Sequence, residues 1–312
     1  MLGFEWAFAQ GKVLTEMAES DPDIVLVSQD IGPFRPFSKR FPERFFDVGI
    51  SEANLIGVAA GLAHAGKLPF VMAMAPFVSM RAFEQLRTDC GYNRNGVKII
   101  APCSGLEGGY WGPTHHAVED LGLLRMIPGM TVLCPADPAE ATRAVRAAAE
   151  VDGPVYIRLG YILPIEGYAE DFEIGRAPLM REGSDVAILA TGASVGQALT
   201  AHDLLKDQGI SARVLNMHTI KPIDREAIEA AAAEIGRILT VEEHFVAGGL
   251  GGAVAEVLAE LGIGRLRRLG LEDEFIVEVA SYPDILKLAG LDAPSIATAA
   301  RSLLDRDDRS AR

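Results

Sequence analysis

Short, uninterrupted apolar runs separated by helical segments constrain this chain more than any other feature. The first half holds four runs of strand length that lack apolar–polar alternation, at 23–28, 97–101, 131–134 and 155–158. Segments with helical character accompany them, at 8–19, 52–65 and 138–151. Strands that are apolar on both faces must be covered on both faces, and intervening helices supply that cover. The sequence therefore predicts an α/β fold built on a parallel sheet.

The alternation stops once and then resumes, which indicates two domains. Residues 164–178 are dominated by Gly, acidic and aromatic residues. Beyond Gly183 there are further apolar runs and helical segments, at 185–190, 195–208, 212–215, 225–234 and 237–241. We predict two doubly wound domains, the first at 1–165 and a smaller second one at 182–305, with a linker at 166–181 and a polar tail at 306–312.

Charge and cysteine content exclude several classes of protein. A net charge of −14 argues against nucleic acid as a partner, because phosphate binding needs clustered Lys and Arg. No apolar run approaches the roughly 18 residues of a membrane span, and the first residues lack the order of a signal peptide. Three scattered cysteines, Cys90, Cys103 and Cys134, are too few for a disulfide framework or a zinc site. We expect a soluble, cytoplasmic protein with no metal ligands of its own.

Glu52 is the first candidate for chemistry. It stands where a strand leads into a helix of Ala and Gly, and a buried acid in apolar company must be hydrogen-bonded or protonated. Near a ligand, such a carboxyl could exchange a proton. The alternative is a helix-start glutamate that complements the helix dipole. From the residues alone the two interpretations are about equally supported.

His115, in the segment Gly112–His116, is the second candidate. A loop histidine after Gly-Pro could donate a proton or hold a substrate, but His116 cannot face the same metal from a helix. A capped helix start with surface imidazoles fits as well.

Further along, the glycines at 248–252 could admit an anion at a helix start. Their spacing does not fit a dinucleotide fingerprint, and tight strand-to-helix packing is the favoured interpretation there.

The order of motifs along nearly the whole chain resembles the transketolase family. The matching segments of the first half are 16–22, 44–63, 69–71, 76–79, 112–115, 127–132, 135–137 and 156–159. Those of the second half are 216–222, 241–244 and 248–251. The resemblance implies a pyrimidine-binding domain followed by a transketolase C-terminal domain. It also implies a thiamine-diphosphate-dependent transferase that moves a two-carbon ketol unit from a ketose to an aldehyde.

The resemblance further implies a missing half. In transketolases another domain holds the cofactor's diphosphate through a metal bound by a Gly-Asp-Gly element and an Asn, and Gly-Asp-Gly does not occur here. Similar proteins are split into two subunits. We therefore expect a partner that carries the diphosphate-binding domain and Mg²⁺ or Ca²⁺, in an α2β2 assembly.

Site residues follow from the family's motifs. The resemblance implies that Glu52 bonds N1′ of the cofactor's aminopyrimidine and promotes the tautomer that activates the cofactor. Phe77 would pack on the pyrimidine, with Met74 and Met80 lining the same pocket. Asp30 would lie near the cofactor. His115 would lie close to the cofactor's amino group and the donor substrate.

Departures from the family pattern bear on the substrate. Cys103 stands where a histidine helps to hold the donor, and Trp111 replaces an aspartate that reads a donor hydroxyl. Tyr161 replaces an arginine that grips phosphate, so Arg158 or a partner arginine would have to substitute. We predict a pocket suited to a non-phosphorylated or specialised ketose, or to a 2-oxo acid.

Two alternatives remain open. One is acyl chemistry on a 2-oxo acid, as in deoxyxylulose-phosphate synthases or the beta subunits of 2-oxo-acid dehydrogenases. The other is a non-catalytic partner subunit. The retained Glu52 argues against the second alternative, because a decayed site has no reason to keep an acid among small apolar neighbours.

Overall fold

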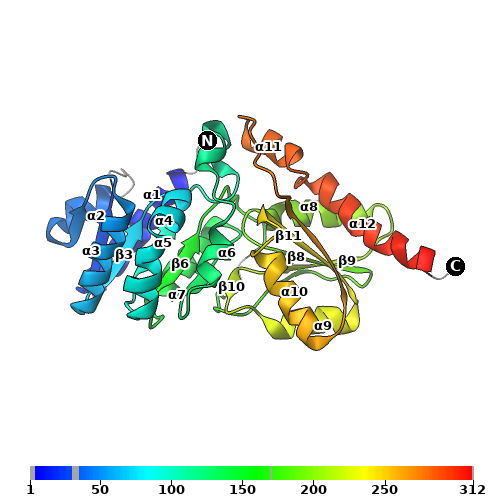
Figure 1. Cartoon of the computed structure of the whole chain (residues 1–312), viewed down its shortest axis with the longest axis horizontal. Coiled ribbons are helices and arrows are strands. Elements are labelled where there is room, and N and C mark those ends of the chain that lie inside the picture. The colour runs from blue at the N-terminus through cyan, green and yellow to red at the C-terminus, as the bar shows by residue number, and fades with distance from the viewer. Residues whose placement is uncertain (1–3, 30–34, 169–170, 311–312) are drawn as a thin grey trace.

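Two largely parallel sheets organise the chain, and helices cover both faces of each (Figure 1). The computed structural model describes residues 4–29, 35–168 and 171–310. The two sheets lie side by side along the long axis of the molecule, with the polypeptide passing from one to the other after β6 (Val155–Arg158). The predicted fold class is confirmed. The predicted domain bounds remain a prediction.

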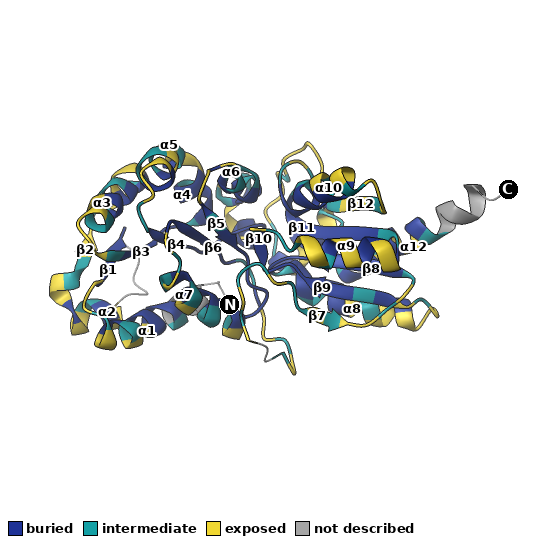
Figure 2. Ribbon diagram, turned by 90° about the horizontal axis from the view of Figure 1, so that it is seen from below, coloured by how far each residue is buried: buried dark blue, intermediate teal, exposed yellow. Residues whose placement is uncertain are grey.

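The first sheet has the strand order β10-β5-β6-β4-β3-β1-β2. Its other strands are β1 (Ile24–Ser28), β2 (Phe45–Asp47), β3 (Leu68–Met72), β4 (Lys98–Ala101), β5 (Thr131–Leu133) and β10 (Thr219–Lys221). One face is covered by α1 (Phe4–Ser20), α2 (Arg35–Arg40) and α7 (Pro138–Ala149), as Figure 2 shows. The opposite face is covered by α3 (Glu52–His64), α4 (Ala75–Arg81), α5 (Phe83–Gln85) and α6 (Asp120–Arg125).

Burial on both faces explains why these strands are uninterrupted apolar runs. Leu26 and Ile100 pack with α1 and α7, while Val27 and Ile99, one residue away on the same strands, pack with α3 and α4. Each of these side chains is at most 1% exposed. Complete burial of such a side chain contributes about 1.5–3 kcal/mol, so the double-sided core dominates the stability of this sheet.

The second sheet has the order β12-β11-β8-β9-β7. These strands are β7 (Leu179–Arg181), β8 (Val186–Ala190), β9 (Ala212–Asn216), β11 (Arg237–Phe245) and β12 (Arg265–Leu271). Helices α8 (Ser194–Lys206) and α12 (Ala293–Ser310) contribute to the core on one face. Helices α9 (Arg225–Glu234) and α10 (Leu250–Leu261) pack on the other face.

One strand ties the two halves together. The short β10 follows β9 in the chain but pairs antiparallel with β5, Thr219 opposite Leu133, so it forms the edge of the first sheet. The amide of Cys134 donates to the carbonyl of His218 at 2.7 Å, and Nζ of Lys221 donates to the carbonyl of Arg125 at 3.0 Å. The first sheet is thus completed by residues that follow the predicted linker.

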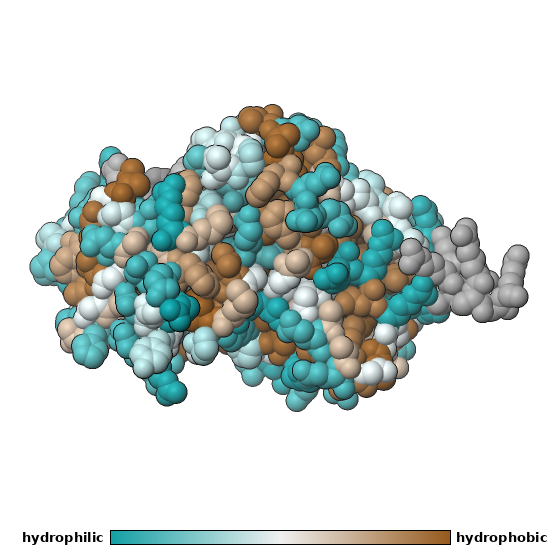
Figure 3. All heavy atoms as spheres, viewed as in Figure 1, coloured by the Kyte–Doolittle hydropathy of each residue, from teal (hydrophilic) through white to brown (hydrophobic). Residues whose placement is uncertain are grey.

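Five short helical segments lie among the connecting loops of the described residues. They are η2 (Pro42–Arg44), the π-type η3 (Leu86–Tyr92), η4 (Glu107–Trp111), η5 (Pro113–His115) and α11 (Tyr282–Leu288). Among the described residues, no helix combines the length and apolar character that a bilayer-spanning segment requires. The face in Figure 3 mixes hydrophilic and hydrophobic residues, with a group of hydrophobic residues at its top.

Candidate active site

Glu52 is the first residue of α3, and its side chain is turned away from solvent. Gly49, with φ of +68°, turns the chain between β2 and this helix, and Glu52 is only 4% exposed. Nε2 of Gln29 donates to Oε1 of Glu52 at 3.4 Å, and Nη1 of Arg81 lies 3.2 Å from the same oxygen. The Arg81 side chain is itself 57% exposed, so the buried acid has a partner that water can replace.

An aromatic group adjoins this carboxylate. Pro76 at the start of α4 favours a helix there, and that helix places Phe77 one turn before Arg81. The guanidinium carbon of Arg81 lies 4.1 Å from the centre of the Phe77 ring. The ring of His115 meets Phe77 edge-on, with centroids 5.2 Å apart, and Trp111 lies 5.4 Å from His115. The structure therefore brings Glu52, Phe77, His115 and Trp111 into one neighbourhood.

The other predicted cofactor residues are Met74, Met80 and Asp30, and they differ in their burial and in whether the structure describes them. Met74 is the N-cap of α4 and is half-buried, whereas Met80 is exposed. Asp30 lies outside the described residues, although Gln29, the residue before it, contacts Glu52. Their roles toward a cofactor remain predictions.

The predicted substrate residues differ in their burial and in their contacts with other side chains. Cys103 is buried, and burial raises the pKa of its thiol. Tyr161 is half-buried and stacks on Tyr282, with centroids 4.2 Å apart. His115 is half-buried, and its Nδ1 lies 2.9 Å from the hydroxyl of Thr114.

Arg158 is already occupied by protein partners. Its Nε donates to both carboxylate oxygens of Asp120, at 2.9 and 3.1 Å, and both side chains are buried. Its Nη2 donates to the carbonyls of Ala117 and Glu243 at 2.9 Å. This arrangement favours a structural role at the joint between the two sheets over direct contact with a substrate phosphate.

The glycines at 248–252 are explained by packing, as predicted. The Glu242 carboxylate accepts from the amides of Leu250 and Gly251, at 2.6 and 2.7 Å. A Cβ on Gly249 would lie 2.0 Å from Oε2 of Glu242. Burial raises the pKa of Glu242 to about 7, and the two amides oppose that rise. This helix start is therefore occupied by the protein's own carboxyl group.

Two neighbours of Glu52 and one neighbour of Cys103 were missed from the sequence. Arg81 stands four residues after Phe77 and Gln29 stands beside Asp30, so helical and strand spacing around predicted residues could have indicated both. Glu107 is buried, and its Oε2 accepts from the amide of Cys103 at 3.1 Å. No sequence pattern indicated this carboxyl.

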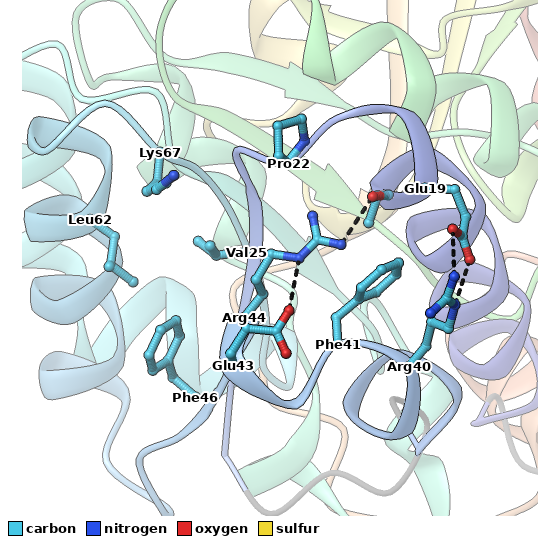
Figure 4. A pocket seen from close by; sticks show the side chains of 11 residues that line it. Glu19, Pro22, Val25, Arg40, Phe41, Glu43, Arg44, Phe46, Leu62 and Lys67 are labelled. Carbon is cyan, nitrogen blue, oxygen red and sulfur yellow. Dashed lines mark hydrogen bonds and ion pairs between the residues drawn. The ribbon is translucent and has the colours of Figure 1, made fainter.

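The described residues hold no cluster of three or more His, Cys, Asp or Glu side chains arranged to bind a metal. A separate hollow of about 680 Å³ lies beside β2, lined by Arg40, Phe41, Arg44 and Lys67 among others (Figure 4). There Arg40 pairs with Glu19 at 2.8 Å and Arg44 donates to backbone carbonyls. None of the predicted site residues lines this hollow.

Comparisons with known proteins agree with the motifs. A model of the transketolase pyrimidine-binding domain matches residues 3–163, and a model of the transketolase C-terminal domain matches residues 175–296. The chain is 42% identical to the 6-deoxy-6-sulfo-D-fructose transketolase subunit SqwH of a Clostridium species, over 94% of this chain and 92% of that one. It is 40% identical to one subunit of the apulose-4-phosphate transketolase of Phocaeicola vulgatus, over 91% of this chain and 92% of that one.

A solved structure is similar over nearly its full length. That protein is described as a split-gene transketolase in an inactive beta4 tetramer. The two chains superpose with a TM-score of 0.87 and are 41% identical, over 97% of this chain and 98% of the other.

Proposed function

Because this chain belongs to the transketolase family, we propose that it is the pyrimidine-binding subunit of a two-subunit, thiamine-diphosphate-dependent transketolase. The observation that carries the proposal is the environment of Glu52. Its carboxylate is buried, yet it is held by an amide at 3.4 Å and by an arginine that is largely exposed. An acid with replaceable partners beside an aromatic ring suits an aminopyrimidine, which needs both a hydrogen-bonding acid and a stacking surface.

The residues of this chain fit the pyrimidine end of that cofactor. When bound, thiamine diphosphate supplies the nucleophilic carbon that adds to a ketose carbonyl. Glu52 would share a proton with N1′ of the pyrimidine, and Phe77 would fix the plane of the ring, with Met74, Met80 and Asp30 nearby. His115, 5.2 Å from Phe77, would serve the donor substrate as a proton donor or acceptor.

A second polypeptide completes the proposed enzyme. We assign to it the cofactor's diphosphate and the Mg²⁺ or Ca²⁺ that binds the diphosphate, in an α2β2 heterotetramer. Support comes from the two relatives that are themselves transketolase subunits, and from the split-gene relative, which is inactive as a beta4 tetramer. The three cysteines are free and buried, and a cytoplasmic location is part of the proposal.

For the substrate, we propose a specialised or non-phosphorylated ketose, with a 2-oxo acid as the second candidate. Trp111 and Tyr161 are aromatic, Cys103 is uncharged and buried, and Arg158 is held by Asp120. Without a dedicated cation, a phosphosugar should bind less well than in enzymes that have one. Arg81 is exposed and lies against the Phe77 ring, so it is a candidate to hold an anionic substrate group.

A donor screen tests the proposal. The chain would be purified alone and with a partner that carries the diphosphate-binding domain, and each sample would be given thiamine diphosphate, Mg²⁺ and an aldehyde acceptor. We expect two-carbon transfer from a ketose only in the presence of the partner. Turnover by the isolated chain contradicts the split-subunit assignment. A strong preference for xylulose 5-phosphate over unphosphorylated ketoses contradicts the substrate assignment, and release of carbon dioxide from a 2-oxo acid establishes the alternative chemistry.

A further inference from the structure

The loop that carries Cys103 and His115 is fastened to the second half of the molecule. This loop, residues 102–119, connects β4 to α6. The amide of Leu106 donates to Oε2 of Glu243 at 3.1 Å, and the amide of Phe245 donates to the carbonyl of Val118 at 2.9 Å. The position of the loop therefore depends on β11 as well as on its own sheet.

Glu107 holds the same loop from inside. Cys103 has φ of +61°, a left-handed backbone conformation that is unfavourable for a residue with a side chain. Its amide donates to Oε2 of Glu107 at 3.1 Å, which helps to keep it in that conformation. The next residue, Gly108, touches the carbonyl of His115, because a Cβ there would lie 2.5 Å from that oxygen. A shift of Glu107 would therefore displace both Cys103 and His115.

The surroundings of Glu107 disfavour its charge. Its side chain is 8% exposed, and Oε1 has no hydrogen-bond partner among the described residues. Burial raises the pKa of Glu107 to about 8; the bond from the Cys103 amide opposes the rise and the charge of Glu243 adds to it. Because Oε2 accepts a hydrogen bond, the proton of the neutral carboxyl belongs on Oε1.

The facing groups come from three other elements. Glu243 on β11 is buried and accepts from the hydroxyl of Tyr282 on α11. Burial raises the pKa of Glu243, while the Tyr282 hydroxyl, the Leu106 amide and the charge of Arg158 on β6 lower it. Burial and the Glu243 charge keep Tyr282 protonated by raising its pKa. An ionised Glu107 would thus add a second carboxylate to a closed space.

We propose that Glu107 is a positioning residue whose neutral form holds the Cys103–His115 loop against Glu243 and Tyr282, and whose ionisation releases that loop. The part of the proposal that concerns activity rests on the proposed function. The part that concerns the loop does not, because the contacts lie within this chain.

The first test is a pH profile of kcat/KM for the complex with its partner. In the wild type, we expect kcat/KM to decrease above about pH 8, by up to tenfold for each pH unit. Glu107→Gln keeps a neutral group of the same shape, so its activity at pH 7 should stay within a few-fold and the alkaline fall should move upward by at least one unit. Glu107→Ala removes the acceptor for the Cys103 amide and should lower kcat at every pH. Glu84→Gln, an exposed position paired with Arg87, should follow the wild type.

The second test uses the chain alone and needs no activity. The pKa of Glu107 is higher in the folded than in the unfolded state, so the folded state binds the additional proton between about pH 4.5 and 8. Stability from this group is complete at low pH and is lost as the pH rises through that window. The unfolding constant of the wild type should therefore rise by up to tenfold more per pH unit than that of Glu107→Gln.

The outcomes separate the two claims. An unchanged pH dependence of unfolding in Glu107→Gln overturns the assignment of the buried proton to Glu107. An altered dependence of unfolding together with an unmoved alkaline limb overturns the positioning role. If the unfolding result is as expected but no donor is turned over, the proposed function fails and the loop contact stands.

Discussion

Two glutamates beside helix starts, Glu52 and Glu242, are both buried but differ in what holds them. Glu242 accepts from two backbone amides of α10, at 2.6 and 2.7 Å, and these donors cannot move away without unwinding the helix. Glu52, the first residue of α3, is held by the side chains of Gln29 and Arg81. Glu242 is therefore part of the fold. Glu52 has partners that a ligand can displace, so burial alone does not distinguish a structural acid from a functional one.

The largest expected effect comes from Glu52→Gln. Glutamine keeps the shape but cannot trade a proton, so turnover of the complex with its partner should fall by about 10²–10⁴-fold, the usual contribution of a positioned acid or base. Turnover at saturating thiamine diphosphate measures this effect, and an unchanged melting temperature of the isolated chain separates it from misfolding. Full activity in this variant would place the acid elsewhere and remove the contrast with Glu242.

Asp120→Asn tests a buried carboxylate that, unlike Glu52, has partners that a ligand cannot displace. The change leaves the buried guanidinium of Arg158 without its counter-charge, so the free energy of unfolding should fall by about 3–5 kcal/mol. Denaturant titration of the chain alone measures the loss. Glu19→Gln is the matched control, because its pair with Arg40 is exposed and screened by solvent and should therefore contribute little. Equal effects of the two changes would contradict the structural role of the Arg158–Asp120 pair.

A smaller effect is expected from Gly249→Ala. The new methyl group would overlap Oε2 of Glu242, so the carboxylate must give up its place over α10 at a cost of about 1–3 kcal/mol in the free energy of unfolding.

The control for this change has the opposite sign. A Cβ on Gly196 in α8 would meet nothing within 4 Å, so Gly196→Ala should stabilise the chain by about 0.4–1 kcal/mol. Thermal unfolding of both variants checks the pair. A neutral Gly249→Ala would mean that the glycines at 248–252 do not serve the packing assigned to them.

The sequence was informative where the strands are buried on both faces. The runs around β1, β4, β8 and β9 were expected within a residue or two, because continuous apolar side chains have few other places to go. The edge strands were harder. β12 mixes charged and apolar residues, with Arg267 and Arg268 adjacent, so it lacks a continuous apolar run. β10 has three residues and joins a sheet that lies earlier in the chain, which no local pattern encodes.

The candidate site divides along similar lines. Glu52, Phe77 and His115 stand in motifs, so they could be named from the sequence, and the structure brings them together. Arg81 was missed although its helical spacing from Phe77 could have indicated it. Glu107 could not be named from the sequence, because its importance comes from a tertiary contact with the Cys103 amide. The role of Arg158 was equally hidden, since its partner Asp120 lies on a different element.

The strand exchange made by β10 has a consequence for biosynthesis. Until Lys221 has left the ribosome, β5 pairs with β6 on one side only, so one edge of Thr131–Leu133 stays open in the nascent first half. A gene fragment that stops at the predicted linker would encode a first half in which this edge of β5 is permanently unpaired. Its product should self-associate through that border, whereas supplying residues 212–222 in trans as a peptide should suppress the association.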